Sequence, residues 1–220
     1  MLDRRRALMM MQGGTQTFPL SDLPAGTGVK IGTDQYILTQ KWTTTAELYK
    51  ESVLPTSMKM HSAGGTPSDY ENSIVDEYLT STFANSLPSG LSQYLILNNI
   101  SYAMVVSGGT STTSKTIQRS IIIPEYNGLA DNSTVVGVLK TYFGTTDAST
   151  ARISKNSGTA VEYWLRDAWT NGTSFNQHTV MNTGLRYRRG RTNSYYVRPV
   201  IYISLSTPVK IVGNEYVLSV

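Results

Sequence analysis

The feature that most constrains the fold is a succession of short apolar segments with strand-type alternation, separated by turns rich in Gly, Thr and Asn. In the last third of the chain these segments predict strands over residues 161–166, about 178–183, about 194–206 and 209–219. The last of these segments is expected to fold into a hairpin around Gly213 and Asn214. The polar segments between them, 167–177 and 184–193, predict loops. Only 15% of the residues are charged, and such chains, rich in Thr, Ser, Asn and Tyr, tend to be β-rich.

Earlier in the chain the pattern predicts a hairpin and two helices. The hairpin covers residues 28–42. Residues 66–88 carry apolar side chains at helical spacing, and we expect Ser68 or Asp69 to cap this helix at its N-terminus. A second amphipathic helix is expected over residues 133–144, where a glycine follows the last apolar position. Helices and strands together predict the α+β class.

The N-terminal segment, residues 1–25, is expected to be an arm attached to one domain over residues 26–220. Three arginines precede a run of methionines, and either a frayed terminus or a docking peptide fits this pattern. The apolar run is shorter than the core of a signal peptide, and no run reaches the roughly 20 residues of a membrane span. We therefore expect synthesis in a cytoplasm without a signal peptide, and no membrane insertion.

Motifs for catalysis and metal binding are sparse. The chain has no cysteine, which excludes disulfides, thiolate metal sites and cysteine nucleophiles. The two histidines, His61 and His178, lack metal-ligand spacing, and the clustered oxygens of a calcium site are missing. Glu162 and Asp167 could in principle act as a glycosidase pair, although nearby carboxylates of this kind are more often a solvated strand edge. We expect no catalysis, no metal and no cofactor.

The positive charge is concentrated near the C-terminus. Residues 161–220 carry 7 Lys and Arg against 3 Asp and Glu, whereas the charges of residues 1–160 cancel. Arginines alternate with tyrosines in the stretch LRYRRGRTNSYYVRP, a combination that can bind single-stranded nucleic acid. No nucleic-acid fold signature accompanies it, so nucleic acid is a disfavoured partner and an exposed basic surface is the simpler interpretation.

Four motifs in order resemble a family of uncharacterised domains common in phages and prophages of Gram-positive gut bacteria. They are DYENSIVDEYLTSTF at 69–83, RSIIIPEYNGL at 119–129, EYWLRDAW at 162–169 and YVRPVIYISL at 196–205. The family typically has Y-W-L-R-[ST] and G-V-R-P-A in the last two. This chain differs at three positions, where Asp167, Tyr196 and Val200 stand.

The resemblance implies a C-type lectin-like fold of the version shared with formylglycine-generating enzymes. This fold packs two helices on a small, twisted, mostly antiparallel sheet with long loops. The enzymes need cysteines, so their activity does not transfer to this chain. The same scaffold carries the variable proteins of diversity-generating retroelements, which bind host surfaces at phage tail tips. Residues 167–196 have the mix of Asn, Tyr, Ser, Asp and His that adenine-directed mutagenesis would leave.

Two kinds of role are expected around the Trp-rich stretch VEYWLRDAWTNG. Trp164 and Leu165 are expected to pack on the two sides of a strand, while Arg166 and Arg198 tie down carbonyls or a carboxylate. Trp169 is expected in the following loop, either as an exposed contact anchor or packed against that loop. The predicted ligand face combines Asp167, Trp169, Asn171, Phe175, Asn176, His178, Arg186, Tyr187, Arg188, Arg189, Arg191, Asn193 and Tyr195.

The expected function is receptor binding by a phage or prophage tail-associated protein. The partners implied are a bacterial surface protein or glycan, and other tail proteins through the N-terminal arm. The resemblance is compatible with a homotrimer, located in the virion and acting at the host cell surface. Two alternatives stay open: a structural tail or decoration protein without a specific ligand, and a cell-wall hydrolase using Glu162 and Asp167.

Overall fold

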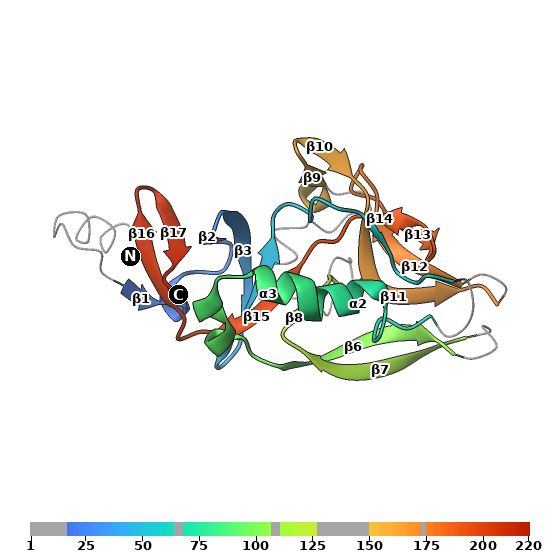
Figure 1. Cartoon of the computed structure of the whole chain (residues 1–220), viewed down its shortest axis with the longest axis horizontal. Coiled ribbons are helices and arrows are strands. Elements are labelled where there is room, and N and C mark those ends of the chain that lie inside the picture. The colour runs from blue at the N-terminus through green and yellow to red at the C-terminus, as the bar shows by residue number, and fades with distance from the viewer. Residues whose placement is uncertain (1–16, 64–67, 107–110, 127–149, 173–174) are drawn as a thin grey trace.

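A computed structural model describes residues 17–63, 68–106, 111–126, 150–172 and 175–220. The molecule is elongated, with one large sheet at one end and smaller sheets at the other (Figure 1). The predicted helix over residues 133–144 lies outside the described residues, as do residues 1–16 of the predicted arm.

An eight-stranded sheet forms one end of the molecule. Its strands, in spatial order, are β1 (Thr17–Pro19), β16 (Pro208–Val212), β17 (Glu215–Leu218), β2 (Gly28–Ile31), β3 (Asp34–Lys41), β4 (Thr45–Lys50), β15 (Val200–Ser204) and β8 (Ile121–Ile122). Neighbours are antiparallel except β17 and β2, which are parallel. The predicted hairpins over 28–42 and 209–219 are confirmed as β2–β3 and β16–β17. Gly32 and Gly213 stand in their turns with φ of +60° and +58°, which glycine adopts without steric cost.

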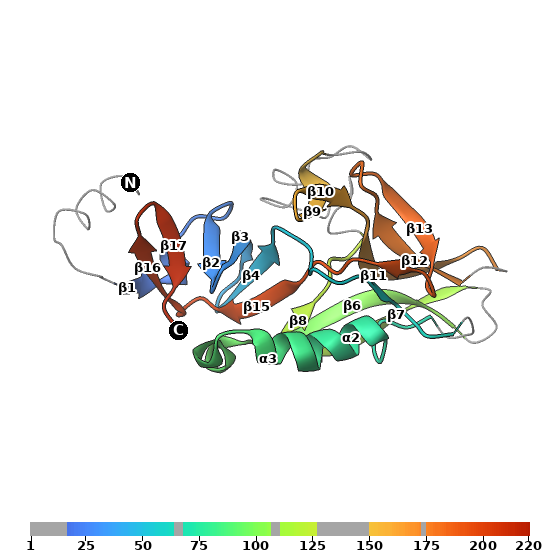
Figure 2. The ribbon, with the colours of Figure 1, turned by 45° about the horizontal axis from the view of Figure 1, so that its top comes forward.

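The other end of the molecule holds the smaller sheets. A three-stranded sheet contains β11 (Tyr163–Thr170), β12 (Phe175–Val180) and β13 (Arg186–Gly190) in that order. The remaining strands pair two by two: β6 (Asn98–Val105) with β7 (Thr112–Arg119), β9 (Ser154–Asn156) with β10 (Thr159–Val161), and β5 (Met58–Lys59) with β14 (Ser194–Tyr195). Figure 2 shows the long β6–β7 hairpin beside the three-stranded sheet.

One continuous helical segment runs along the molecule between its two ends (Figure 2). It consists of α2 (Ile74–Tyr78), a π-helical turn η2 (Leu79–Phe83) and α3 (Ala84–Ser86). Its N-terminal cap is Ser73, whose Oγ accepts a hydrogen bond from the Asp76 N–H at 3.1 Å, rather than Ser68 or Asp69. Short 3₁₀ turns are η1 (Leu20–Asp22), η3 (Ser89–Tyr94) and η5 (Thr150–Arg152).

The predicted fold class is wrong. In the part of the chain that the structure describes, strands dominate, and the segment Ile74–Ser86 is the only helix longer than a short 3₁₀ turn. The fold is therefore mostly β with several sheets, rather than an α+β, C-type lectin-like arrangement of two helices on one small sheet. Polar composition caused much of the error, because the segments expected to be loops, 167–177 and 184–193, contain the end of β11, the first half of β12 and all of β13.

One hydrophobic core extends through the molecule: the large sheet contributes Leu38, Leu48 and Ile201, and the three-stranded sheet contributes Trp164 and Leu165. A buried carboxylate accompanies them: Glu47 accepts hydrogen bonds from Thr39 Oγ1 at 2.8 Å and from the Tyr202 hydroxyl at 3.0 Å. Hydrogen bonds of this kind are what allow a polar group to be buried.

The described part of the predicted arm is packed on the domain. Strand β1 pairs with β16, and Leu20 and Leu23 belong to the hydrophobic core. Residues 17–23 are therefore part of the folded domain.

Candidate ligand-binding cleft

Strand β11 carries the Trp-rich stretch and is anchored on both sides. The Trp164 Nε1–H donates to the Met58 carbonyl at 2.8 Å, and its ring meets the Tyr195 ring edge-on at 4.9 Å. On the other side, the hydroxyl of Tyr163 donates to the Arg152 carbonyl at 2.9 Å. Tyr163, Trp164 and Leu165 are all fully buried. These residues fix the position of the strand from which the candidate site is built.

Two buried arginines hold the chain around β11. Arg166 donates to the carbonyls of Ile123 at 3.2 Å and Ser101 at 3.3 Å, and it forms an ion pair with Glu125. Arg198 donates to the Lys50 carbonyl at 2.7 Å and to the Tyr163 hydroxyl at 3.3 Å. The planar guanidinium suits this task because its donors point in several fixed directions.

The three-stranded sheet presents two different faces. Residues paired directly across antiparallel strands share a face, and neighbours along a strand alternate. Asn176 pairs with Trp169, and His178 with Arg188. We call this side the histidine face; it comprises Trp169, Asn176, His178, Arg186 and Arg188. The opposite side is the cleft face; it comprises Gln177, Thr179, Tyr187 and Arg189.

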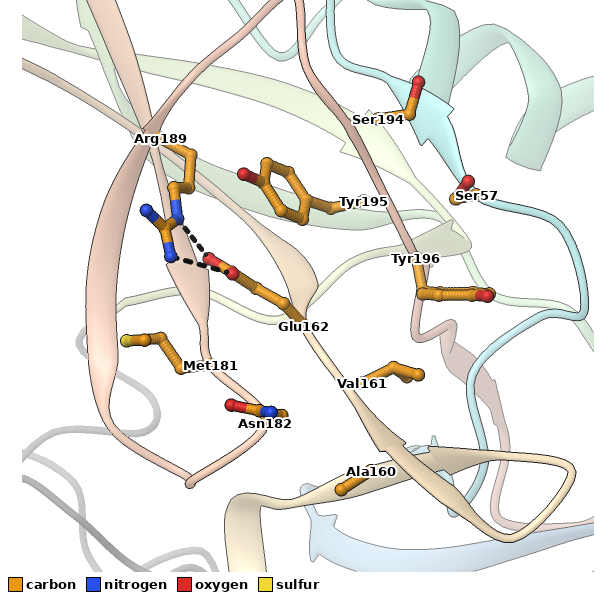
Figure 3. Close-up of a pocket in the computed structure, with 10 residues that line it drawn as sticks. All are labelled: Ser57, Ala160, Val161, Glu162, Met181, Asn182, Arg189, Ser194, Tyr195 and Tyr196. Carbon is orange, nitrogen blue, oxygen red and sulfur yellow. Dashed lines mark hydrogen bonds and ion pairs between the residues drawn. The ribbon is translucent and has the colours of Figure 1, made fainter.

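An open cleft of about 380 Å³ lies at the cleft face, where β10, β11, β13 and β14 approach one another. It is lined by Ser57, Ala160, Val161, Glu162, Met181, Asn182, Arg189, Ser194, Tyr195 and Tyr196. Figure 3 shows the side chains of Glu162 and Arg189 pointing toward each other, with the Tyr195 ring beside them.

The ion pair between Glu162 and Arg189 organises this cleft. Glu162 Oε1 accepts from Arg189 Nε at 2.9 Å and from Thr179 Oγ1 at 2.6 Å, and Oε2 accepts from Arg189 Nη2 at 3.2 Å. Hydrogen bonding to Glu162 raises the pKa of Arg189. The guanidinium also lies over the ring of Tyr187, 4.7 Å from its centre, and 5.9 Å from the centre of the Tyr195 ring. The fork geometry and the rings together fix the orientation of the arginine.

The histidine face is built from stacked rings and guanidinium groups. His178 stacks on Tyr126 with ring centroids 4.0 Å apart, and burial lowers the pKa of His178 to about 4. The Arg186 guanidinium lies over the Tyr126 ring, 4.5 Å from its centre. Arg188 covers the ring of Trp169 at 4.0 Å. Trp169 therefore lies in strand β11 and is partly covered by Arg188, so the prediction that it stands in a loop is wrong.

Asp167 is occupied by backbone groups. Its Oδ1 accepts from the Ala103 N–H at 2.9 Å, and its Oδ2 accepts from the Tyr126 N–H at 2.6 Å. Tyr126 lies against the histidine face, whereas Glu162 is held on the cleft face. The two carboxylates thus point to different sides of the sheet and do not flank a common space, so this geometry gives no support to a glycosidase pair.

The predicted ligand face is divided by the sheet. Tyr187, Arg189 and Tyr195 lie at or beside the cleft, whereas the residues of the histidine face are directed away from it. Phe175 begins β12 with the buried Arg191 over its ring at 5.4 Å. Asn171 and Asn193 are exposed at bends outside the strands.

Several residues that line the cleft were not predicted from the sequence, because only the pairing of distant strands brings them together. They are Ser57, Val161, Met181, Asn182 and Tyr196.

Neither a metal cluster nor a membrane-spanning helix is found in the described ranges. No three His, Asp or Glu side chains there are grouped so that they could hold a metal ion. Likewise, the described helices are too short or too polar to cross a membrane.

Comparison with known proteins identifies the family of this mostly-β domain. Residues 34–205 match the family model described as "Domain of unknown function (DUF6273)", and this match covers most of the chain. The chain therefore belongs to the DUF6273 family. No curated protein and no solved structure has detectable similarity to it.

Proposed function

We propose that this protein is a non-catalytic binding protein that recognises a ligand on a bacterial surface through the cleft and the neighbouring Tyr187. The observation that carries the proposal is the arrangement of Arg189, which is paired with Glu162 and stacked on Tyr187 beside an open cleft. Tyr187 is 47% exposed, so its ring is accessible to a partner.

The energetics of recognition favour such a surface. Tyrosine and arginine dominate binding hot spots because they supply a large contact area and several hydrogen bonds. Arg189 is already oriented by its ion pair and by the rings, so binding sacrifices little of its conformational freedom. The cleft adds a concave surface of the kind that small polar ligands occupy.

The biological setting of the proposal is a phage or prophage tail. It rests on the resemblance carried by residues 162–169 and 196–205 and by the two upstream motifs. In this setting the protein is part of the virion and acts at the host cell surface, with other tail proteins and a host glycan or protein as partners. Diversification of residues 167–196 by a retroelement belongs to the same proposal.

A structural role in the tail is the second candidate function. Leu97 is 66% exposed and Trp42 is 42% exposed, and neither residue lines the cleft. Large apolar side chains on a surface are common contact points between subunits. On this alternative, Leu97 and Trp42 would become buried in assembled particles, and the cleft would have no ligand.

The proposed function is tested by binding of labelled protein to intact Gram-positive gut bacteria. The double variant Tyr187→Ala/Arg189→Ala is compared with Trp169→Ala, which removes a large ring from the opposite face. We expect the double variant to lose about tenfold or more in affinity, the range of a hot-spot deletion, and Trp169→Ala to bind like the wild type. Failure of the wild type to bind any strain, together with its presence in virions, would support the structural role instead.

A further inference from the structure

The charge balance of the cleft restricts the ligands that it can take. Among the described residues that line the cleft, Glu162 and Arg189 are the only charged ones, and their charges neutralise each other. The other lining residues are serines, an asparagine, tyrosines and small or apolar side chains. A cleft without net charge has no electrostatic preference for an anion or a cation, and it favours a neutral polar ligand.

The ion pair retains hydrogen-bonding capacity on both of its members. Arg189 uses Nε and one N–H of Nη2 toward Glu162, and a guanidinium has five N–H donors in all. Glu162 Oε2 accepts one hydrogen bond from the described residues, while each carboxylate oxygen has room for two. Donors and an acceptor thus lie side by side at the wall of the cleft. This pattern matches two adjacent hydroxyl groups, one of which donates to Glu162 while the other accepts from Arg189.

The rest of the wall supplies a rigid apolar surface beside the ion pair. The backbone of Tyr196 is fixed on both sides, since its N–H donates to the Glu162 carbonyl at 3.1 Å and its carbonyl accepts from the Trp164 N–H at 3.0 Å. Val161 and Met181 lie nearby in the lining (Figure 3). Sugars have apolar C–H faces as well as hydroxyls, and aromatic side chains with a polar handle suit such ligands.

The geometry points to a neutral saccharide as the ligand of this cleft, held by a vicinal diol between Glu162 and Arg189. This inference rests on the proposed function and names the chemical class of its ligand. The cleft volume of about 380 Å³ is at the lower end of small-molecule sites, which suits a short saccharide segment rather than a folded partner. The carboxylate supplies the acceptor for the diol, and the guanidinium supplies the donors.

The test measures binding of soluble probes by titration calorimetry or ligand-observed NMR. The probes are neutral glucose, galactose and mannose oligosaccharides, with uronic-acid and sialic-acid oligosaccharides as the charged comparison. Glu162→Gln keeps the size of the side chain and removes its charge. Asn182→Trp, at an exposed turn, obstructs the cleft without changing the ion pair. Leu97→Ala, in a separate surface hollow, is the matched control.

We expect at least one neutral oligosaccharide to bind, and Glu162→Gln and Asn182→Trp each to weaken this binding about tenfold or more. Leu97→Ala should bind like the wild type. Binding that survives both cleft variants would overturn the inference, and so would tighter binding of an acidic oligosaccharide than of any neutral one by the wild type.

The outcomes separate this inference from the proposed function. Cell binding that depends on Tyr187 and Arg189, without binding of any neutral saccharide, refutes the ligand class and leaves the receptor-binding function in place. Saccharide binding in the cleft without attachment to any cell supports the ligand class and refutes the cell-surface role.

Discussion

The eight-stranded sheet and the three-stranded sheet are stabilised in different ways. The larger sheet buries aliphatic side chains such as Leu38, Leu48 and Ile201. The smaller sheet also buries Trp164 and Leu165, but it adds contacts between charged groups and rings at its surface, such as the ion pair of Glu162 with Arg189. Polar contacts of this kind fix orientation and leave donors and acceptors at the surface. The candidate binding chemistry of this protein therefore lies in the region whose strands are the most polar.

The largest expected effect on stability concerns Arg166, which connects strand β11 of the smaller sheet to the carbonyls of Ser101 and Ile123. Arg166→Met removes the donors to two carbonyls and leaves the partly buried Glu125 without its ion-pair partner. Each carbonyl left without its donor costs about 1–3 kcal/mol of unfolding free energy, and loss of the partly exposed ion pair adds less than about 1 kcal/mol; chemical denaturation measures the total. The control is Arg188→Met on the exposed surface, for which we expect a change below about 1 kcal/mol. If the two variants lowered the unfolding free energy equally, the hydrogen bonds of Arg166 would not contribute more to stability than a surface arginine does.

The next effect is a pH dependence located in the smaller sheet. Burial lowers the pKa of His178 to about 4, below the ordinary value of 6.5, so the folded state binds fewer protons than the unfolded state between these values. Stability from this residue is complete above pH 6.5 and is lost as the pH falls toward 4, by up to about 3 kcal/mol. Denaturation at a series of pH values should give a shallower slope in this window for His178→Phe, which keeps a ring against Tyr126. An unchanged slope would place the acid sensitivity elsewhere.

A smaller effect of opposite sign is expected in the eight-stranded sheet. Burial raises the pKa of Glu47 above its ordinary value of 4.5, although hydrogen bonds from Thr39 and Tyr202 oppose the shift. The folded state therefore binds the proton more tightly, and stability from this residue falls as the pH rises from 4.5 through the folded-state pKa. Glu47→Gln should remove this decline and raise the unfolding free energy at pH 7. Thr45→Val, on the same strand, is a control that leaves the carboxylate in place. If the stability of Glu47→Gln still fell as steeply with rising pH, Glu47 would not be the group responsible for this fall.

Local sequence signals predicted much of the larger sheet. The hairpins around Gly32 and Gly213 were predictable because each turn has a glycine with positive φ between alternating apolar segments. The helix within 66–88 was also predictable, but its start was not. Asp69, one of the expected caps, instead pairs with Lys115 and accepts from the Tyr102 hydroxyl, contacts between residues far apart in the sequence.

The smaller sheet was less predictable because its strands lack apolar alternation. Arg186, Tyr187, Arg188 and Arg189 read as a solvated loop, yet they form β13 by pairing with β12. Glu162 and Arg189 were each noticed in the sequence, but their pairing depends on the register of three strands. Tyr187, Arg189 and Tyr195 were predicted ligand contacts that lie at or beside the cleft, while Trp169 and His178 lie on the opposite face. Composition identified the region, and long-range pairing decided the site.

The pairing of β1 with β16 lies at the end of the molecule opposite the cleft, which is useful for attaching the protein to a surface. It brings residues 17–19 beside residues 208–210, and the C-terminus lies at this same end, opposite the three-stranded sheet (Figure 1). A tether attached at the C-terminus would therefore hold the protein by one pole and leave the cleft at the other. Beads or sensor chips coated in this way would display the cleft outward, and any pulling force between anchor and ligand would run along the long axis of the molecule.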